Sequence, residues 1–293
     1  MPDINTWLLI SPELILTIVG LLIVVVDLVG REQSEPILPW LAVLGFALAF
    51  AATWSGFSAN QSLFAGMYAV DTYSSFFKLI GAGAGLLTTL VSIDFLRGRT
   101  KFKGDFYFLL TYAVLATMMM ASATSLLMVY LSIEFLSYMS YLLAGFMRED
   151  KKSNEAAIKY FLYGAVTSAV MLYGLSLLYG ISGSLNLADM AKVFATSTEA
   201  STRELGLVAF ALTLAGFGFK IAAFPFHQWS PDVYEGAPTP VVAFLSVGSK
   251  AAGFAILMRV ALTAFQIAKM ASPMNLTTVP SVLWMHLPTA ASK

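Results

Sequence analysis

Long apolar segments alternate with short polar ones along most of this chain. Eight of the apolar segments are close to 20 residues or longer, the length of helix that spans about 30 Å of hydrocarbon. These segments are 7–29, 37–55, 75–96, 106–122, 125–146, 157–181, 205–231 and 238–265. The pattern predicts an all-α fold, a polytopic transmembrane helix bundle with about eight spans.

The two ends of the chain differ from this pattern. The first apolar segment is too long for the core of a signal peptide, contains Glu13 and has no basic stretch before it, so we interpret it as a permanent span. The tail from Lys269 to Lys293 is rich in Pro, Ser and Thr, and its apolar stretch at 282–287 is short. We therefore expect residues 266–293 to form a non-spanning tail.

Composition supports the membrane assignment and excludes several functions. Apolar residues make up 58% of the 293 positions, charged residues 12%, and the mean hydropathy is +0.77, whereas soluble domains carry about 25% charged residues. The net charge is zero, which argues against a nucleic-acid partner. The chain has no cysteine and two histidines, His227 and His286. We expect neither a metal nor a redox cofactor in this chain, because thiolate ligands for iron–sulfur clusters are missing.

Basic residues cluster after alternate spans, which predicts an orientation. They are Arg31 after the first span, Arg97, Arg99, Lys101 and Lys103 after the third, and Arg148, Lys151 and Lys152 after the fifth. Because short cytoplasmic loops carry the excess of Lys and Arg, odd-numbered spans should end in the cytoplasm. The N-terminus should then lie on the non-cytoplasmic side, together with the loops 56–74 and 182–204.

Three ionisable residues stand out because they fall near the middle of a predicted span or well inside it. They are Glu134 in the fifth, Lys220 in the seventh and Lys250 in the eighth. Each costs at least about 2.5–3.5 kcal/mol at mid-membrane on insertion scales, so such side chains face the bundle interior, pair or contact water. One interpretation is a structural Glu–Lys pair that locks two helices, with Lys250 reaching to the membrane surface. The other is proton transfer: burial disfavours the charged form of lysine, a nearby carboxylate favours it, and arginine could not release its proton.

A proline-rich break follows Lys220. Pro225 removes a backbone hydrogen bond and frees a carbonyl near Lys220, as broken helices do at transporter ion sites. Residues 226–241 contain three prolines and a glycine, so we expect them to turn the chain without continuing a helix. His227 is a candidate proton relay or a structural histidine, and Asp232 and Glu235 are expected to cap or solvate the turn.

The spans also contain glycines and hydroxyl-bearing residues at positions that bear on helix packing and on proton transfer. The glycines at 81 and 85 predict close approach of a neighbouring helix, and those at 216 and 218 do not form a nucleotide loop. Around Glu134 the fifth span carries hydroxyls that would order a water chain or bond to adjacent helices. They belong to Ser132, Ser137, Ser140, Tyr138 and Tyr141.

Three stretches resemble the antiporter-like membrane subunits of respiratory complex I, NADH-quinone oxidoreductase. Residues 225–240 read PFHQWSPDVYEGAPTP, residues 131–146 read LSIEFLSYMSYLLAGF, and residues 154–165 read NEAAIKYFLYGA. The form of the first stretch is similar to that of the subunit N, or chain 2, branch of the family. The resemblance extends over about residues 1–265.

The resemblance implies a function and a set of residues. In this family the glutamate of helix 5 and the lysines of helices 7 and 8 translocate protons, which correspond here to Glu134, Lys220 and Lys250. It implies no cofactor in this chain, with NADH, FMN, iron–sulfur clusters and quinone bound elsewhere in the complex. It also implies other membrane-arm subunits and the lipid bilayer as partners, and a bacterial cell membrane as the location.

The resemblance also implies an organisation that this chain matches in part. Family members have about 14 helices with two inverted repeats, roughly helices 4–8 and 9–13. Residues 1–104 would be helices 1–3 and residues 105–265 the first repeat, so one of the two repeats is present. Two alternatives remain: a subunit of a multisubunit cation/proton antiporter, which shares these motifs, and a non-pumping structural membrane subunit.

Overall fold

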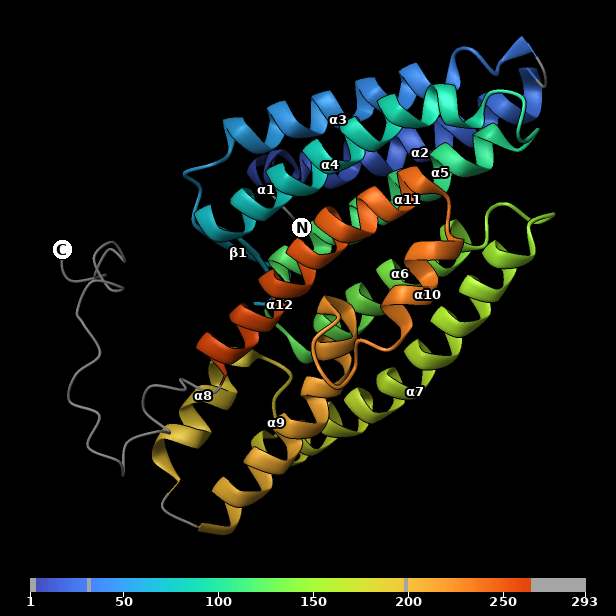
Figure 1. Ribbon diagram of the computed structural model, residues 1–293. Coiled ribbons are helices and arrows are strands. Elements are labelled where there is room, and N and C mark those ends of the chain that lie inside the picture. Colours follow the sequence, from blue (N-terminus) through green and yellow to red (C-terminus); the bar gives the residue numbers. More distant parts are fainter. Residues whose placement is uncertain (1–3, 31–32, 198–199, 265–293) are drawn as a thin grey trace, which may run out of the picture.

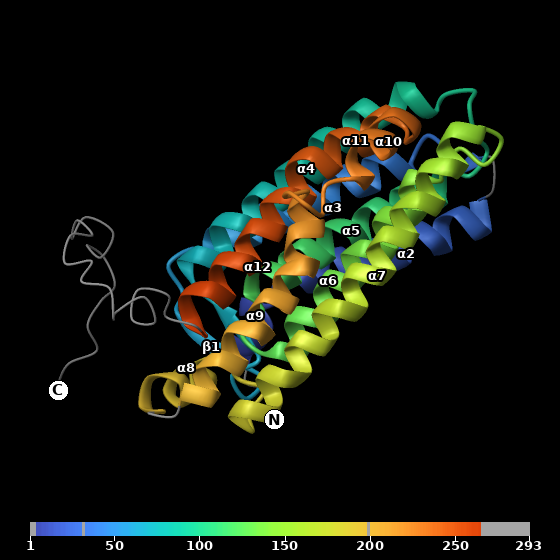
Figure 2. The ribbon, with the colours of Figure 1, turned by 60° about the horizontal axis from the view of Figure 1, so that its bottom comes forward.

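The computed structural model describes residues 4–30, 33–197 and 200–264 (Figure 1). Among these residues, eight helices are long and apolar enough to cross a membrane. They are α2 (Ser11–Gly30), α3 (Leu38–Ser55), α4 (Thr72–Leu96), α5 (Lys103–Ser122), α6 (Leu126–Ala144), α7 (Lys151–Ser182), α9 (Ala200–Ile221) and the continuous helix formed by α11 (Thr239–Phe244), η2 (Leu245–Ser249) and α12 (Lys250–Thr263). The helices run side by side in one bundle (Figure 2), which confirms the predicted polytopic fold.

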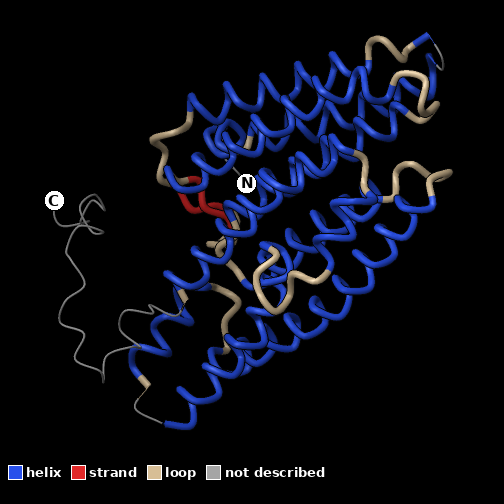
Figure 3. The backbone as a smooth tube through the Cα atoms, viewed as in Figure 1, coloured by secondary structure: helices blue, strands red, loops and turns tan. Residues whose placement is uncertain are grey.

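Short elements gather at one end of the bundle. The strands β1 (Gln61–Leu63) and β2 (Tyr68–Val70) form an antiparallel hairpin, and α8 (Leu187–Thr196) follows α7. The backbone of the α5–α6 turn bonds to the turn of the hairpin and to the segment before α8. Thr124 N donates to Met67 O at 3.0 Å, and Leu126 N donates to Leu185 O at 2.8 Å. We call this the hairpin end; its two strands are red in Figure 3. The sequence analysis treated residues 56–74 and 182–204 as loops. The two strands were missed because three residues carry too little pattern to detect.

The opposite end, which we call the basic end, carries the clustered Lys and Arg residues. Arg99, Lys101, Lys103 and Arg148 line one depression of about 930 Å³, and Lys103 forms an ion pair with Glu35 at its edge. The basic segments after the third and fifth predicted spans therefore lie at the same end of the bundle.

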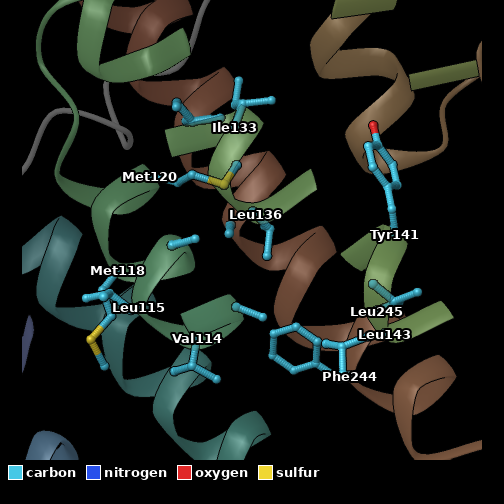
Figure 4. Close-up of a cluster of buried hydrophobic side chains, with 14 of the residues drawn as sticks. Val114, Leu115, Met118, Met120, Ile133, Leu136, Tyr141, Leu143, Phe244 and Leu245 are labelled. Carbon is cyan, nitrogen blue, oxygen red and sulfur yellow. The ribbon is translucent and has the colours of Figure 1, made fainter. Parts of the chain in front are cut away.

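The core is built around α5, which packs against α2, α4 and α6. Apolar side chains of α5, α6 and α11 meet there, among them Val114, Met118, Leu136 and Phe244 (Figure 4). On α4, a Cβ atom at Gly81 would lie 2.5 Å from Thr117 Oγ1. The small-residue contact that the sequence predicted is therefore a close approach of α4 and α5.

Three predicted boundaries are corrected by the structure. The first predicted span is divided, since residues up to Leu9 form the separate helix α1 (Ile4–Leu9) and α2 begins at Ser11. The seventh ends at Ile221 and not at residue 231. Residues 226–241 are not free of helix, because Trp229–Gly236 form α10. Pro231 lies in the first turn of α10, where its missing N–H has no partner to lose.

Candidate functional site

Lys220 is the most enclosed of the three candidate charges. It lies in the last turn of α9 with 1% of its surface exposed. Its ammonium donates a hydrogen bond to Ser137 Oγ of α6 at 3.1 Å. Its aliphatic stem packs against α12, where a Cβ atom at Gly253 would lie 3.4 Å from Lys220 Cγ. A buried lysine is therefore held between three helices with a hydroxyl group as its hydrogen-bond acceptor.

Glu134 lies on α6 three residues before Ser137, which is nearly one helical turn. Its carboxylate is half-buried and accepts a hydrogen bond from the Ser168 hydroxyl of α7. Within the described part of the chain, no ion pair joins Glu134 to Lys220, although Lys220 bonds to Ser137, nearly one turn from Glu134 on the same helix. The two residues are neighbours, but they do not form the direct locking pair that the structural interpretation required.

Lys250 follows a break in the regular geometry of its helix. Residues 245–249 form the π-helical segment η2, and Lys250 is the first residue of α12. Such segments occur frequently at functional sites, and nothing in the sequence pattern had indicated this one. The half-buried ammonium lies 5.3 Å from the centre of the Tyr234 ring of α10. Lys250 precedes Gly253 by one turn, so the two candidate lysines lie on adjoining helices.

The helix break next to Lys220 lies nearer to it than Pro225 does. Helix α9 ends at Ile221, and Ala222 has a positive φ of 55°. The carbonyl of Phe219, beside Lys220, accepts hydrogen bonds from Trp229 Nε1 at 3.0 Å and from Ala222 N at 3.1 Å. This carbonyl at the helix end is therefore occupied and not free. Pro225 itself is exposed, beyond the break.

Helix α10 packs against α7 and α9 through aromatic contacts, and ion pairs with α7 lie at the surface. The Trp229 ring stacks on Tyr160 with centroids 4.3 Å apart and an interplanar angle of 16°. At the surface Lys159 pairs with Asp232 at 2.5 Å, and Lys152 pairs with Glu235 at 2.7 Å. Asp232 and Glu235 thus bind α10 to α7, a role the sequence analysis did not anticipate.

His227 lies apart from the other candidates. Its side chain is exposed in the segment between α9 and α10, and its ring lies 5.8 Å from that of Phe224. The structure does not bring it into contact with Glu134, Lys220 or Lys250. The relay role stays a prediction.

The hydroxyls of α6 bond mostly within their own helix. Ser132, Ser137 and Ser140 donate to the carbonyls of Val129, Ile133 and Leu136 at 3.2, 2.7 and 2.6 Å. Tyr141 is buried and its ring packs edge-on against Tyr160, whereas Tyr138 is half exposed. Ser137 also accepts from Lys220, so it is the hydroxyl that joins the two helices.

Sequence reasoning missed one buried charge, Lys78 of α4. Its side chain is as buried as that of Lys220 and forms an ion pair with Glu13 at 2.8 Å. The signal was available: Lys78 is a lysine in the first turns of an apolar segment, and Glu13 is a carboxylate in another. Within the described residues, no cluster of three or more His, Asp or Glu side chains is placed to hold a metal ion.

Comparison with known proteins identifies the chain's relatives. The family model described as NADH:quinone oxidoreductase/Mrp antiporter, TM, matches residues 123–290. The chain is 39% identical over 276 residues to NADH-quinone oxidoreductase subunit N of Trichlorobacter lovleyi, covering 94% of this chain and 56% of that protein. It is 44% identical over 260 residues to NAD(P)H-quinone oxidoreductase subunit 2 of a Synechocystis strain, covering 87% and 50%. The chain therefore spans about half the length of these curated relatives.

Two solved structures share the fold. A chain of respiratory complex I from Thermus thermophilus aligns with a TM-score of 0.72 and 35% identity, covering 88% of this chain and 55% of that one. A chain of an archaeal membrane-bound sulfane sulfur reductase aligns with a TM-score of 0.67 and 23% identity, covering 85% and 51%, a likeness of fold alone. The family match and the identities together place this chain in the NADH:quinone oxidoreductase/Mrp antiporter family of transmembrane proteins.

Proposed function

We propose that the chain is a proton-translocating membrane subunit of an NADH-quinone oxidoreductase, in which quinone reduction by the complex drives proton export. Lys220 and Lys250 carry the protons, and Glu134 controls how firmly Lys220 holds its proton. The chain itself performs no electron transfer. NADH, FMN, iron–sulfur clusters and quinone would be bound by other subunits of the complex.

One observation carries this proposal. Lys220 is almost fully buried in the membrane-spanning bundle, and its hydrogen bond goes to a serine hydroxyl and not to a carboxylate. An ammonium in such a place is costly, so small changes in its surroundings decide whether it keeps its proton. Glu134, nearly one turn from Ser137 on the same helix, is the charge able to make that change.

A mechanism follows from the placement of the three charges. When Glu134 moves toward Lys220, its negative charge stabilises the ammonium and Lys220 takes up a proton. When Glu134 returns to Ser168, the ammonium loses that support and passes its proton toward Lys250 on the adjoining helix. The π-helical segment before Lys250 allows local adjustment of that helix during the transfer.

The setting proposed for this chemistry is the plasma membrane of a bacterium. The clustered basic residues favour the basic end as the cytoplasmic face, with the N-terminus and the hairpin end on the opposite side. Protons would then enter near Lys220 from the cytoplasm. Neighbouring membrane-arm subunits would deliver the coupling signal to Glu134 and receive the proton from Lys250.

Replacing Lys220 by alanine tests the proposal. In inverted membrane vesicles that contain the complex, K220A should abolish most proton uptake driven by NADH while the chain remains inserted and assembled. Lys192→Ala is a matched control, because Lys192 is an exposed lysine on α8. Normal proton uptake per quinone reduced in K220A would overturn the assignment.

A second candidate function is a subunit of a multisubunit cation/proton antiporter. The description of the matched family names Mrp antiporters as well as NADH:quinone oxidoreductases. An antiporter would dissipate an imposed pH gradient when sodium is added, in vesicles without NADH. Sodium-dependent dissipation that disappears in K220A would favour the antiporter. If sodium has no effect and NADH drives proton uptake, the oxidoreductase subunit is favoured.

A further inference from the structure

A second buried ionic cluster lies away from the Lys220 site, at the hairpin end. The Lys78 ammonium of α4 is 2.8 Å from Glu13 Oε1 of α2. The Tyr68 hydroxyl of β2 donates a hydrogen bond to the same carboxylate oxygen at 2.6 Å. Lys78 is 1% exposed, and Glu13 retains 12% of its side-chain exposure. Two side chains from separate elements therefore converge on the carboxylate of a third.

A cavity of about 640 Å³ reaches this cluster at Lys78. It lies between the starts of α2 and α4, the end of α3 and the segment before the hairpin, and Lys78 forms part of its wall. Its polar lining residues include Ser11, Thr53, Asn60, Gln61, Ser75 and Lys78. Apolar cavities stay dry, but a cavity of this size with several polar groups accommodates water.

The cluster has unused hydrogen-bonding capacity. Glu13 Oε2 is buried and has no hydrogen-bond partner in the protein. A lysine ammonium has three donors, and one of them is directed at Glu13. An unpartnered buried carboxylate oxygen is costly, so a donor is expected at Oε2, either a water molecule from the cavity or a proton on the carboxyl group itself.

The charges around the cluster indicate what it binds. Lys78 repels a metal cation and Glu13 repels an anion, which leaves the proton as the ion that both can exchange. Burial and the adjacent Glu13 raise the pKa of the Tyr68 hydroxyl well above its usual value, so Tyr68 stays a donor. From α12, Arg259 faces this region but is paired with Asp71 at 2.9 Å.

The other packed elements add no competing charge. Helix α3 contains no ionisable residue, and the charged residues of α5, Lys103 and Asp105, lie at the basic end. Glu13 and Lys78 are therefore the two opposite charges of this cluster that face each other.

We propose that Glu13, Tyr68 and Lys78 form a proton-exchange site that water reaches through the cavity from the hairpin end of the bundle. Glu13 accepts a proton from cavity water and returns it there, while Lys78 and Tyr68 position the carboxylate. The site goes beyond the proposed function, since it gives the chain a proton-binding group on the face opposite the basic end.

Cysteine accessibility tests the aqueous route without relying on pumping. Because the chain has no native cysteine, a single Ser75→Cys in the assembled complex reports on the cavity wall one turn from Lys78. A membrane-impermeant methanethiosulfonate applied from the hairpin side should modify S75C at least about tenfold faster than Ser92→Cys, because thiol reactivity follows access to water. Ser92 is an equally buried serine at the other end of α4, and Asn60→Cys, at an exposed position, identifies the hairpin side.

The outcomes of this experiment are distinct from those of the K220A test. Modification of S75C from the hairpin side supports the route whether or not K220A pumps. Modification of S75C no faster than S92C overturns the proposal, even if K220A abolishes pumping.

A second measurement tests the proton itself. In proteoliposomes containing the complex, the infrared band of a protonated carboxyl group should change as the pH on the hairpin side is varied. This change should be absent in Glu13→Gln and retained in Glu13→Asp, which keeps a carboxylate. A purely structural ion pair would give the same spectrum in wild type and Glu13→Gln, and that result overturns the proposal.

Discussion

The two most buried lysines of the described chain are equally enclosed, but one contacts a carboxylate and the other a hydroxyl group. Lys78 and Lys220 are each 1% exposed. Lys78 is in contact with a carboxylate, Glu13, that also accepts a hydrogen bond from Tyr68. Lys220 is bonded to the Ser137 hydroxyl, and the nearby carboxylate of Glu134 is bonded to Ser168 instead. Lys78 therefore has a carboxylate in direct contact, whereas Lys220 depends on a partner that is able to move.

The two lysines also differ in their backbone setting. Lys78 lies inside the regular helix α4, six residues after its start. Lys220 lies one residue before the end of α9, beside the Phe219 carbonyl to which the Trp229 indole is bonded. The paired lysine is held in regular structure, and the unpaired one lies where the backbone changes direction, which is where transporters place their ion sites.

Breaking the Glu13–Lys78 pair should produce the largest loss of stability. Glu13→Gln leaves the Lys78 ammonium buried without a counter-charge, and removal of one partner of a buried pair costs about 3–5 kcal/mol. The measurement is the temperature at which the chain, within its purified complex, becomes sensitive to protease. The double variant Glu13→Gln with Lys78→Met should recover much of the loss, because it leaves no unpaired charge.

The same substitution at the other lysine sharpens the comparison. Lys220→Met removes a buried charge that is not in a direct ion pair, so heat resistance should be unchanged or increased while pumping is lost. Equal destabilisation by Lys220→Met and Glu13→Gln would show that the two sites are electrostatically alike.

The Asp71–Arg259 pair should give an intermediate effect with a defined pH dependence. Arg259 contacts both oxygens of Asp71 at 2.9 Å. Although burial alone would raise the pKa of Asp71, hydrogen bonds and charge from Arg259 hold it below the ordinary value. The stabilisation is therefore present above about pH 4, the unfolded value, and is lost as pH falls through the lower pKa of the folded state.

Asp71→Asn should cost about 2 kcal/mol at neutral pH, the usual worth of hydrogen bonds to a charged group. It should also remove this part of the acid sensitivity when heat resistance is compared at pH 7 and below pH 4. An unchanged acid profile in Asp71→Asn would mean that the pair does not govern stability at the hairpin end.

Trp229→Phe should have a smaller effect, confined to the Lys220 side of the comparison. It keeps the stacking on Tyr160 but removes the N–H that bonds to Phe219 O. This carbonyl also accepts from Ala222 N at 3.1 Å, so the expected loss is about 1 kcal/mol. Pumping should fall more than stability does, because the end of α9 positions Lys220. Equal pumping in wild type and Trp229→Phe would show that the hydrogen bond of the indole does not help to position Lys220.

How much of this could be predicted from the sequence depends on the range of the interactions. The spans were predictable because the bilayer imposes about 20 apolar residues on each helix, and the cost of burial singled out Lys220 and Lys250. The pairing of Glu13 with Lys78 was not, because the sequence shows a charge in each of two apolar segments but not that their helices bring the two side chains together. The π-helical segment before Lys250 packs against α4, and a segment of this length leaves no period in the sequence.

The smallest effect is expected at Lys152 and Glu235, which repeat the chemistry of the Glu13–Lys78 pair at the surface. Their nitrogen–oxygen distance is 2.7 Å, close to that of the buried pair, but the two side chains are 67% and 70% exposed. Water already solvates both charges, so exposed pairs often contribute nothing measurable. Lys152→Ala should leave heat resistance unchanged in the assay that detects Glu13→Gln. If Lys152→Ala were as damaging as Glu13→Gln, burial would not be what distinguishes the paired lysine at the hairpin end.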